Sequence, residues 1–91
     1  MRHRATREFW TFFDRLPDEI QELARKNFKL LNDDPAHPSL HFKYAGAGWS
    51  VRIGRKYRAL ATKRPDGYAW LWIGPHEEYM RRLKEMARHP D

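Results

Sequence analysis

The sequence predicts an α+β fold: two N-terminal helices packed on a four-stranded, mostly antiparallel sheet, followed by a short C-terminal helix. Three observations lead to this prediction. Apolar residues recur with helical spacing up to residue 31, large apolar and polar side chains alternate with strand spacing between residues 40 and 73, and helical spacing returns after Pro75. Helices followed by consecutive strands are typical of this class. A length of 91 residues corresponds to one domain over residues 1–91.

Two helices are predicted before residue 35. The first covers residues 5–15, and its apolar face consists of Ala5, Phe9, Phe12, Phe13 and Leu16. Pro17 interrupts it and suits the first turn of a second helix, where the acidic Asp18 and Glu19 interact favourably with the helix dipole. The apolar stripe of the second helix consists of Ile20, Leu23, Ala24, Phe28 and Leu31, and residues 32–35 end it.

The first three strands are predicted over residues 40–44 and in the two arms of a hairpin at 49–63. Alternation in the hairpin places Trp49, Val51 and Ile53 on one face, which we expect to receive the N-terminal helices. Ser50 and Arg52 fall on the other face, as does Arg58 in the second arm. The hairpin therefore predicts a core on one side of the sheet and a basic surface on the other.

A fourth strand and a last helix complete the predicted fold. The Pro-Asp-Gly sequence at 65–67 is a strong turn signal, and the strand after it covers residues 68–73. Alternation places Tyr68, Trp70 and Trp72 on one face, and Ala69, Leu71 and Ile73 on the other. Because both faces are apolar, we expect this strand to be central. A helix over 75–87 has Tyr79, Met80, Leu83 and Met86 as its packing residues.

The net charge of +6 is concentrated in the middle of the chain. Residues 38–75 contain seven Lys or Arg and one acid, Asp66, whereas the rest of the chain is neutral. Positive charge interleaved with aromatic residues predicts a surface for a polyanion such as RNA. A solvated basic sheet face without a partner is the alternative. The candidate RNA-binding residues are His41, Lys43, Ser50, Arg55, Lys56, Lys63 and Arg64.

Several other classes of protein are disfavoured. The chain has no cysteine, which excludes disulfides and thiolate metal sites and is consistent with a reducing compartment. His37 and His41 flank a proline in a loop and strand, so their spacing predicts no metal site, and no cofactor motif is present. Residues 1–7 are not followed by a signal-type apolar run, and no segment is long and apolar enough to cross a membrane. We therefore expect a cytoplasmic protein.

Four residues are the candidate catalytic set: Arg52, Arg58, His76 and Tyr79. The alternation of side chains along the predicted strands places His41 and Ser50 near this set. Such a set can cleave RNA without a metal, since the substrate's 2′-hydroxyl is the nucleophile, histidine can transfer protons, and arginine stabilises charge on the phosphate. Each also has a structural alternative. The arginines can clamp acidic residues of a partner, His76 can cap a helix, and Tyr79 can belong to the core.

The motif Trp49-Ser50-x-Arg52-Ile53-x-x-x-Tyr57-Arg58 resembles the RelE/ParE superfamily of bacterial toxins from type II toxin-antitoxin pairs. Pro38-Ser39-Leu40 before it and Trp72-Ile73-Gly74-x-His76-Glu77-Glu78-Tyr79 after it extend the resemblance over nearly the whole chain. The resemblance implies a RelE-like fold and a cognate antitoxin that wraps the toxin. In the mRNA-cleaving members it also implies cleavage in the ribosomal A site, with Arg58 at the position of the arginine that steadies the scissile phosphate and Arg52 at a basic strand position.

The same resemblance leaves the activity open. The glutamate base of one subgroup and the paired lysines of another have no match here, and Ser50 stands where one such lysine would be. His76 or His41 is the substitute base. The leading hypothesis is a ribosome-dependent mRNA endonuclease. A DNA gyrase inhibitor that acts by protein contacts, or a non-catalytic member that binds only nucleic acid or antitoxin, is the alternative.

Overall fold

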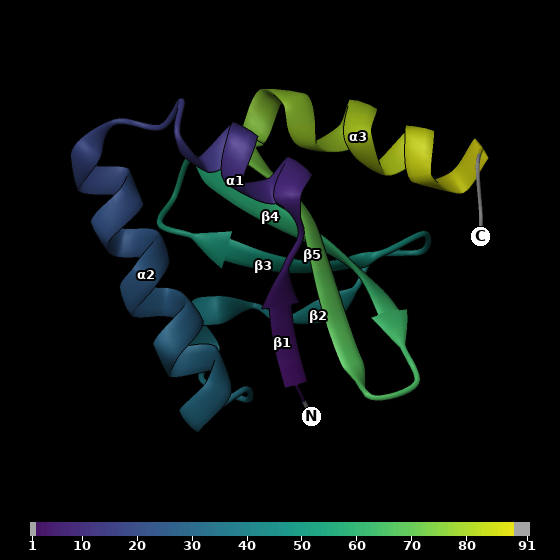
Figure 1. Ribbon diagram of the computed structural model, residues 1–91, viewed down its shortest axis with the longest axis horizontal. Coiled ribbons are helices and arrows are strands. Elements are labelled where there is room, and N and C mark those ends of the chain that lie inside the picture. The colour runs from purple at the N-terminus through teal and green to yellow at the C-terminus, as the bar shows by residue number, and fades with distance from the viewer. Residues whose placement is uncertain (1, 89–91) are drawn as a thin grey trace.

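The computed structural model describes residues 2–88 and confirms the α+β fold (Figure 1). Its strands form one sheet in the order β1-β5-β4-β3-β2, in which β1 pairs in parallel with β5 and the other neighbours are antiparallel. The elements in chain order are β1 (Arg2–Ala5), α1 (Arg7–Phe13), α2 (Asp18–Asp33), a 3₁₀ turn (Pro38–Leu40), β2 (Lys43–Tyr44), β3 (Trp49–Ile53), β4 (Tyr57–Arg64), β5 (Gly67–Pro75) and α3 (His76–Arg88).

The strand β1 is an element that the sequence analysis missed. Residues 2–5 alternate between exposed and half-buried, as an edge strand does, and helix α1 starts only after them. Thr6 sets that start because its Oγ1 accepts a hydrogen bond from the Phe9 N–H at 3.2 Å. Gly67 lets β1 approach, since a Cβ there would collide with the backbone of Arg2. The sheet therefore has a fifth strand, and the first helix is shorter than predicted.

The prediction of a strand over residues 40–44 is also partly wrong. Its first residues belong to the 3₁₀ turn, and only Lys43 and Tyr44 pair with β3. His41 separates the two parts because its φ of 46° lies in the left-handed region, where extended pairing is lost. The resulting turn places the His41 side chain at the edge of the sheet.

A bulge in the pairing of β4 with β5 changes which face the tryptophans occupy. Leu60 lies opposite Trp72 but the next residue, Ala61, lies opposite Trp70, so Leu71 is the extra residue. Trp70 packs with α1 and α2, whereas Trp72 joins Leu60 on the other face. The prediction that Trp72 shares a face with Tyr68 and Trp70 is thus wrong, because a single extra residue reverses the alternation.

Two clusters of buried residues stabilise the two faces of the sheet. The larger one contains Val51 and Ile53 and packs against Phe9 and Phe13 of α1 and Leu31 of α2, as the sequence predicted. The smaller one contains the buried residues Leu60, Trp72 and Tyr79, with Phe12, Leu83 and Met86 packed against it. Helix α3 therefore covers the Arg58 face of the sheet, opposite the N-terminal helices. No helix between residues 2 and 88 is long and apolar enough to cross a membrane.

Candidate functional site

Two arginines lie directly opposite each other on the α3 side of the sheet. The register of β3 with β4 pairs Arg52 with Arg58. Like charges in a directly opposed cross-strand pair destabilise a sheet. Among the ion pairs of residues 2–88, none connects either arginine to a carboxylate. A pair of cations without a compensating acid can bind an external anion such as a phosphate group.

Arg52 is held by the hairpin turn and by His41. Its Nε donates to the Gly54 carbonyl at 3.1 Å, and its Nη1 lies 3.4 Å from His41 Nε2. The Arg52 carbonyl accepts a hydrogen bond from Asn27 Nδ2 of α2 at 3.1 Å, which fixes this end of β3. Because a guanidinium can only donate, its contact requires a lone pair on His41 Nε2. His41 Nε2 therefore faces Arg52, and it accepts this hydrogen bond in the tautomer that carries its proton on Nδ1.

Arg58 is half-buried and is held by backbone carbonyl groups. Its Nη1 donates to the Tyr57 carbonyl at 2.8 Å and to the Arg55 carbonyl at 3.4 Å. Burial lowers the pKa of Arg58, the nearby Arg52 cation lowers it further, and Tyr79 has the opposite effect. The side chain remains a cation at neutral pH. Its positive charge is thus held in place by carbonyl groups and is not neutralised.

Helix α3 brings His76 and Tyr79 to the same end of the sheet. The His76 N–H donates to the Lys56 carbonyl at 2.7 Å, which joins the start of α3 to the turn between β3 and β4. The rings of His76 and Tyr79 stack with centroids 6.1 Å apart. Tyr79 is only 9% exposed and packs with the core, whereas His76 is exposed. The ring of Tyr79 therefore supports that of His76 from below.

Glycine at position 74 shapes the floor of this site. Gly74 lies opposite Arg58 across the β4–β5 pair, and a Cβ there would lie 2.6 Å from the Trp72 ring. Only glycine lets the Trp72 ring lie this close to the backbone at position 74 without a shift. The sequence motif contains Gly74, but the wrong face predicted for Trp72 hid its role.

The other predicted RNA-binding residues divide into two groups. Arg55 and Lys56 are exposed in the turn beside the arginine pair, and Lys43 is exposed on β2. Ser50 pairs with Lys43 but is only 3% exposed, so its hydroxyl is not presented to a ligand. Lys63 lies over the Tyr68 ring on the opposite face of the sheet, with its Nζ 5.3 Å from the centroid. The structure therefore places Arg55 and Lys56 beside the arginine pair and separates Ser50 and Lys63 from it.

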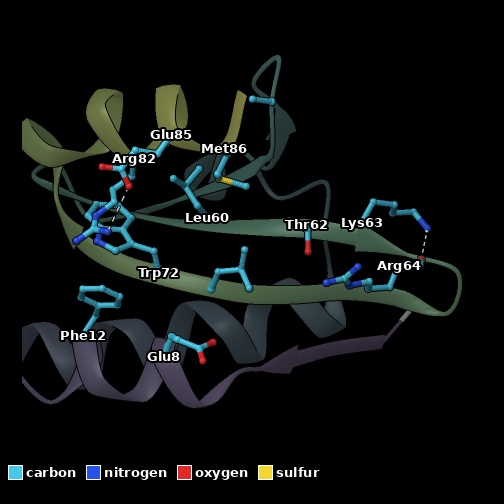
Figure 2. A pocket seen from close by; sticks show the side chains of 12 residues that line it. Glu8, Phe12, Leu60, Thr62, Lys63, Arg64, Trp72, Arg82, Glu85 and Met86 are labelled. Carbon is cyan, nitrogen blue, oxygen red and sulfur yellow. Dashed lines mark hydrogen bonds and ion pairs between the residues drawn. The ribbon is translucent and has the colours of Figure 1, made fainter. Parts of the chain in front are cut away.

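A groove of about 660 Å³ continues along the same face between α3 and α1 (Figure 2). Figure 2 shows Arg82 and Met86 of α3 above Leu60 and Trp72, with Phe12 of α1 below. Its apolar lining is formed by Phe12, Leu60, Leu71, Trp72 and Met86. Two buried polar atoms in its lining, Thr62 Oγ1 and Arg82 Nε, make no hydrogen bond. Lys63 and Arg64, both predicted to bind RNA, also contribute to its lining.

Sequence reasoning missed this groove. The sequence analysis assigned Phe12 to the apolar face of the first helix and Trp72 to the other face of the sheet. It did not single out Arg82. Helical spacing from Tyr79 to Arg82 and Met86 is a signal that could have found it, since these residues recur at offsets of three and four on α3.

Comparisons with known proteins agree with the fold and the family. The sequence model of the ParE-like toxin domain matches residues 18–81. A chain of the RelB-RelE antitoxin-toxin complex from Methanococcus jannaschii is similar in structure, with a TM-score of 0.67 and 11% identity over 86% of this chain and 95% of that one. A chain of the RelE-RelB complex from Pyrococcus horikoshii OT3 has a TM-score of 0.59 and 17% identity, covering 81% of this chain and 92% of the other.

The RelBE2 toxin-antitoxin complex from Mycobacterium tuberculosis contains a third similar chain, with a TM-score of 0.61 and 19% identity over 81% of this chain and 95% of that one. No curated protein matches the sequence significantly. At these identities the structures establish the fold, and the family is established by the domain match over most of the chain. The chain belongs to the ParE-like toxin domain family of the RelE/ParE superfamily.

Proposed function

We propose that this protein is the toxin of a toxin-antitoxin pair and cleaves mRNA on the ribosome without a metal ion. The observation that carries the proposal is the opposed pair Arg52 and Arg58, without a carboxylate partner in the described chain and with His41 and His76 at the same end of the sheet. Membership of a toxin family supports the biological role.

The residues suit cleavage by the substrate's own 2′-hydroxyl. His41 accepts the 2′-hydroxyl proton at Nε2 when phosphate replaces it as the partner of Arg52. The 2′-oxygen attacks the adjacent phosphorus, Arg52 and Arg58 stabilise the charge on its non-bridging oxygens, and the bond to the 5′-oxygen breaks. Protonated His76 donates its proton to the leaving 5′-oxygen. The products are a 2′,3′-cyclic phosphate and a 5′-hydroxyl, and no further reactant is needed.

The shape of the site supports a requirement for the ribosome. In-line attack needs the 2′-oxygen, the phosphorus and the 5′-oxygen to be aligned. His41 and His76 are exposed, and the lining of the groove between α3 and α1 includes neither arginine. The protein alone thus offers charge and proton transfer but little alignment. A second surface that holds the mRNA, such as the ribosomal A site, would supply it.

The groove between α3 and α1 is our candidate for the antitoxin. The similar structures are described as complexes of a toxin with its antitoxin. An apolar segment with a backbone carbonyl near Arg82 Nε would cover the apolar lining and satisfy a buried donor that has no partner. Because the groove continues the face of Arg58, a bound antitoxin segment would also block access to the arginine pair.

Inducible expression with and without Arg58→Ala tests the proposal. The wild-type chain is expected to stop growth and to produce mRNA breaks at A-site codons. Arg58→Ala should lose on the order of 10²-fold in cleavage rate or more. Arg7→Ala is the matched control because Arg7 is an exposed cation on α1. Equal breaks with Arg58→Ala, or growth arrest without any breaks, would contradict an endonuclease centred on Arg58.

Inhibition of DNA gyrase is the second candidate. The match to a ParE-like domain favours it, because the ParE toxins that the sequence resembles act on gyrase by binding. In that case the purified protein would inhibit supercoiling by gyrase and leave mRNA intact. The endonuclease proposal predicts the reverse pair of results.

A further inference from the structure

We propose that a row of aromatic side chains on the sheet face opposite the arginine pair stacks on unpaired bases of single-stranded RNA. The row is formed by Tyr44 on β2, Trp49 on β3 and Tyr68 on β5, and we refer to it as the aromatic row. The inference rests on the proposed function only for the identity of the RNA, because the RNA on the aromatic row is the same molecule whose phosphate the arginine pair binds.

The sheet register places the aromatic row on one face. Tyr44 lies opposite Trp49 across the β2–β3 pair. Their ring centroids are 5.7 Å apart, and those of Trp49 and Tyr68 are 5.2 Å apart. Trp49 also contacts Phe42, whose ring centroid is 5.2 Å away and which supports the row from the side. The His3 ring stacks on Tyr68, with centroids 5.1 Å apart, so Tyr68 supports the row. Tyr44 and Trp49 offer the flat surfaces on which bases of any sequence can stack.

The outer end of the aromatic row is open to solvent. Tyr44 is 58% exposed, more than Trp10 and Met80, the other large exposed apolar side chains of the described chain. Its hydroxyl donates to the Gly46 carbonyl at 2.8 Å, which holds the ring against the turn. An ordered ring with both an exposed surface and a supporting neighbour is prepared to stack on a base at a small entropic cost.

Charge on the sheet favours a nucleic acid as the occupant. Strands β2 to β5 contain Lys43, Arg52, Arg58, Lys63 and Arg64, and their sequences contain no Asp or Glu. Lys63 lies within the aromatic row itself, with its Nζ 5.3 Å from the Tyr68 ring centroid. A cation next to aromatic rings is the combination that holds the phosphates and bases of a single strand. This assigns a role to Lys63, which lies away from the arginine pair.

The position of β2 connects the two faces. Lys43 and Tyr44 are consecutive residues of this edge strand, so Lys43 points to the arginine face and Tyr44 to the aromatic row. An RNA strand with its scissile phosphate at the arginine pair can therefore pass Lys43, cross the edge of the sheet and place the next bases on Tyr44 and Trp49. Within residues 2–88, no strand pairs with the outer side of β2 that would block this path.

Binding of a short fluorescent RNA with 2′-O-methyl groups, which cannot be cleaved by 2′-hydroxyl attack, tests this inference. Tyr44→Ala is expected to weaken binding of the single strand by on the order of tenfold, and to weaken binding of the corresponding duplex much less. Tyr44→Phe is the matched control, because it loses the same hydrogen bond to Gly46 but keeps the ring. It should bind within about twofold of wild type.

Two results would overturn the inference. One is a Tyr44→Ala variant that binds single-stranded RNA as tightly as wild type. The other is a Tyr44→Ala variant that weakens binding of the duplex as much as that of the single strand, which would exclude stacking on unpaired bases. Cleavage of unmodified mRNA separates the two proposals. Tyr44→Ala should raise KM with kcat unchanged, whereas Arg58→Ala should lower kcat.

Discussion

Acidification is expected to destabilise the protein through His3 on the edge strand β1. Trp70 is 1% exposed, and its Nε1 donates to His3 Nδ1 at 3.1 Å. The His3 ring also stacks on Tyr68, with centroids 5.1 Å apart and an interplanar angle of 12°. A proton on Nδ1 would remove the acceptor of a buried indole N–H. The native fold therefore requires neutral His3.

The sign of the effect follows from the direction of the pKa shift. Burial lowers the pKa of His3 below its ordinary value of 6.5. As the pH falls through about 6.5, the unfolded chain takes up the proton before the folded chain does. The contribution of His3 to stability is thus complete above that pH and is lost below it. Losing the hydrogen bond costs about 1 kcal/mol, because His3 is only half-buried and solvent replaces part of the contact.

Urea unfolding at about pH 7 and at about pH 5 measures this contribution. We expect the free energy of unfolding of the wild-type protein to fall by about 1 kcal/mol on acidification because of His3. His3→Phe keeps a stacking ring without an acceptor, so it should be less stable at neutral pH and lack this part of the pH dependence. His37→Gln, a substitution in a loop, is the control and should keep the pH dependence of the wild-type protein. An unchanged pH dependence in His3→Phe would refute the reasoning.

Two further predictions concern the packing of the sheet and the groove. Gly67→Ala should lower the free energy of unfolding by about 2 kcal/mol, because a Cβ collides with the backbone of β1. Gly46→Ala, which also has positive φ but has no atom within 4 Å of its Cβ, should lose less in the same urea experiment. Arg82→Ala should weaken co-purification with the cognate antitoxin. Arg81→Ala, an exposed neighbour paired with Glu78, should not, and equal effects of the two would remove Arg82 from the antitoxin site.

Local sequence patterns predicted the elements that depend on local interactions. The apolar stripe of residues 18–33 and the alternation in the hairpin at 49–63 gave α2, β3 and β4 with nearly the observed bounds. Strand β1 was missed because its four residues have no apolar pattern of their own and depend on a parallel partner more than sixty positions away. The face of Trp72 was wrong because a bulge depends on the pairing of two strands and leaves no mark in the sequence of one.

The parts of the candidate site that depend on local sequence pattern were also predictable. Alternation alone placed Arg52 and Arg58 on one face, and the register made them direct neighbours. The contact of Arg52 with His41 depends on a left-handed turn that the sequence did not indicate, since residues other than glycine uncommonly adopt positive φ. Ser50 followed the same parity but is buried by its neighbours, because position on a face does not determine exposure.

The identity of the nucleophile is the most direct test of the proposed function. A purified translation system programmed with an mRNA whose A-site codon carries one 2′-O-methyl group next to the scissile phosphate provides it. The wild-type protein should cleave the unmodified mRNA, leave a 2′,3′-cyclic phosphate, and fail to cleave the modified mRNA. Cleavage of both mRNAs at the same rate would contradict attack by the 2′-hydroxyl, and cleavage of neither would contradict the assignment of an mRNA endonuclease.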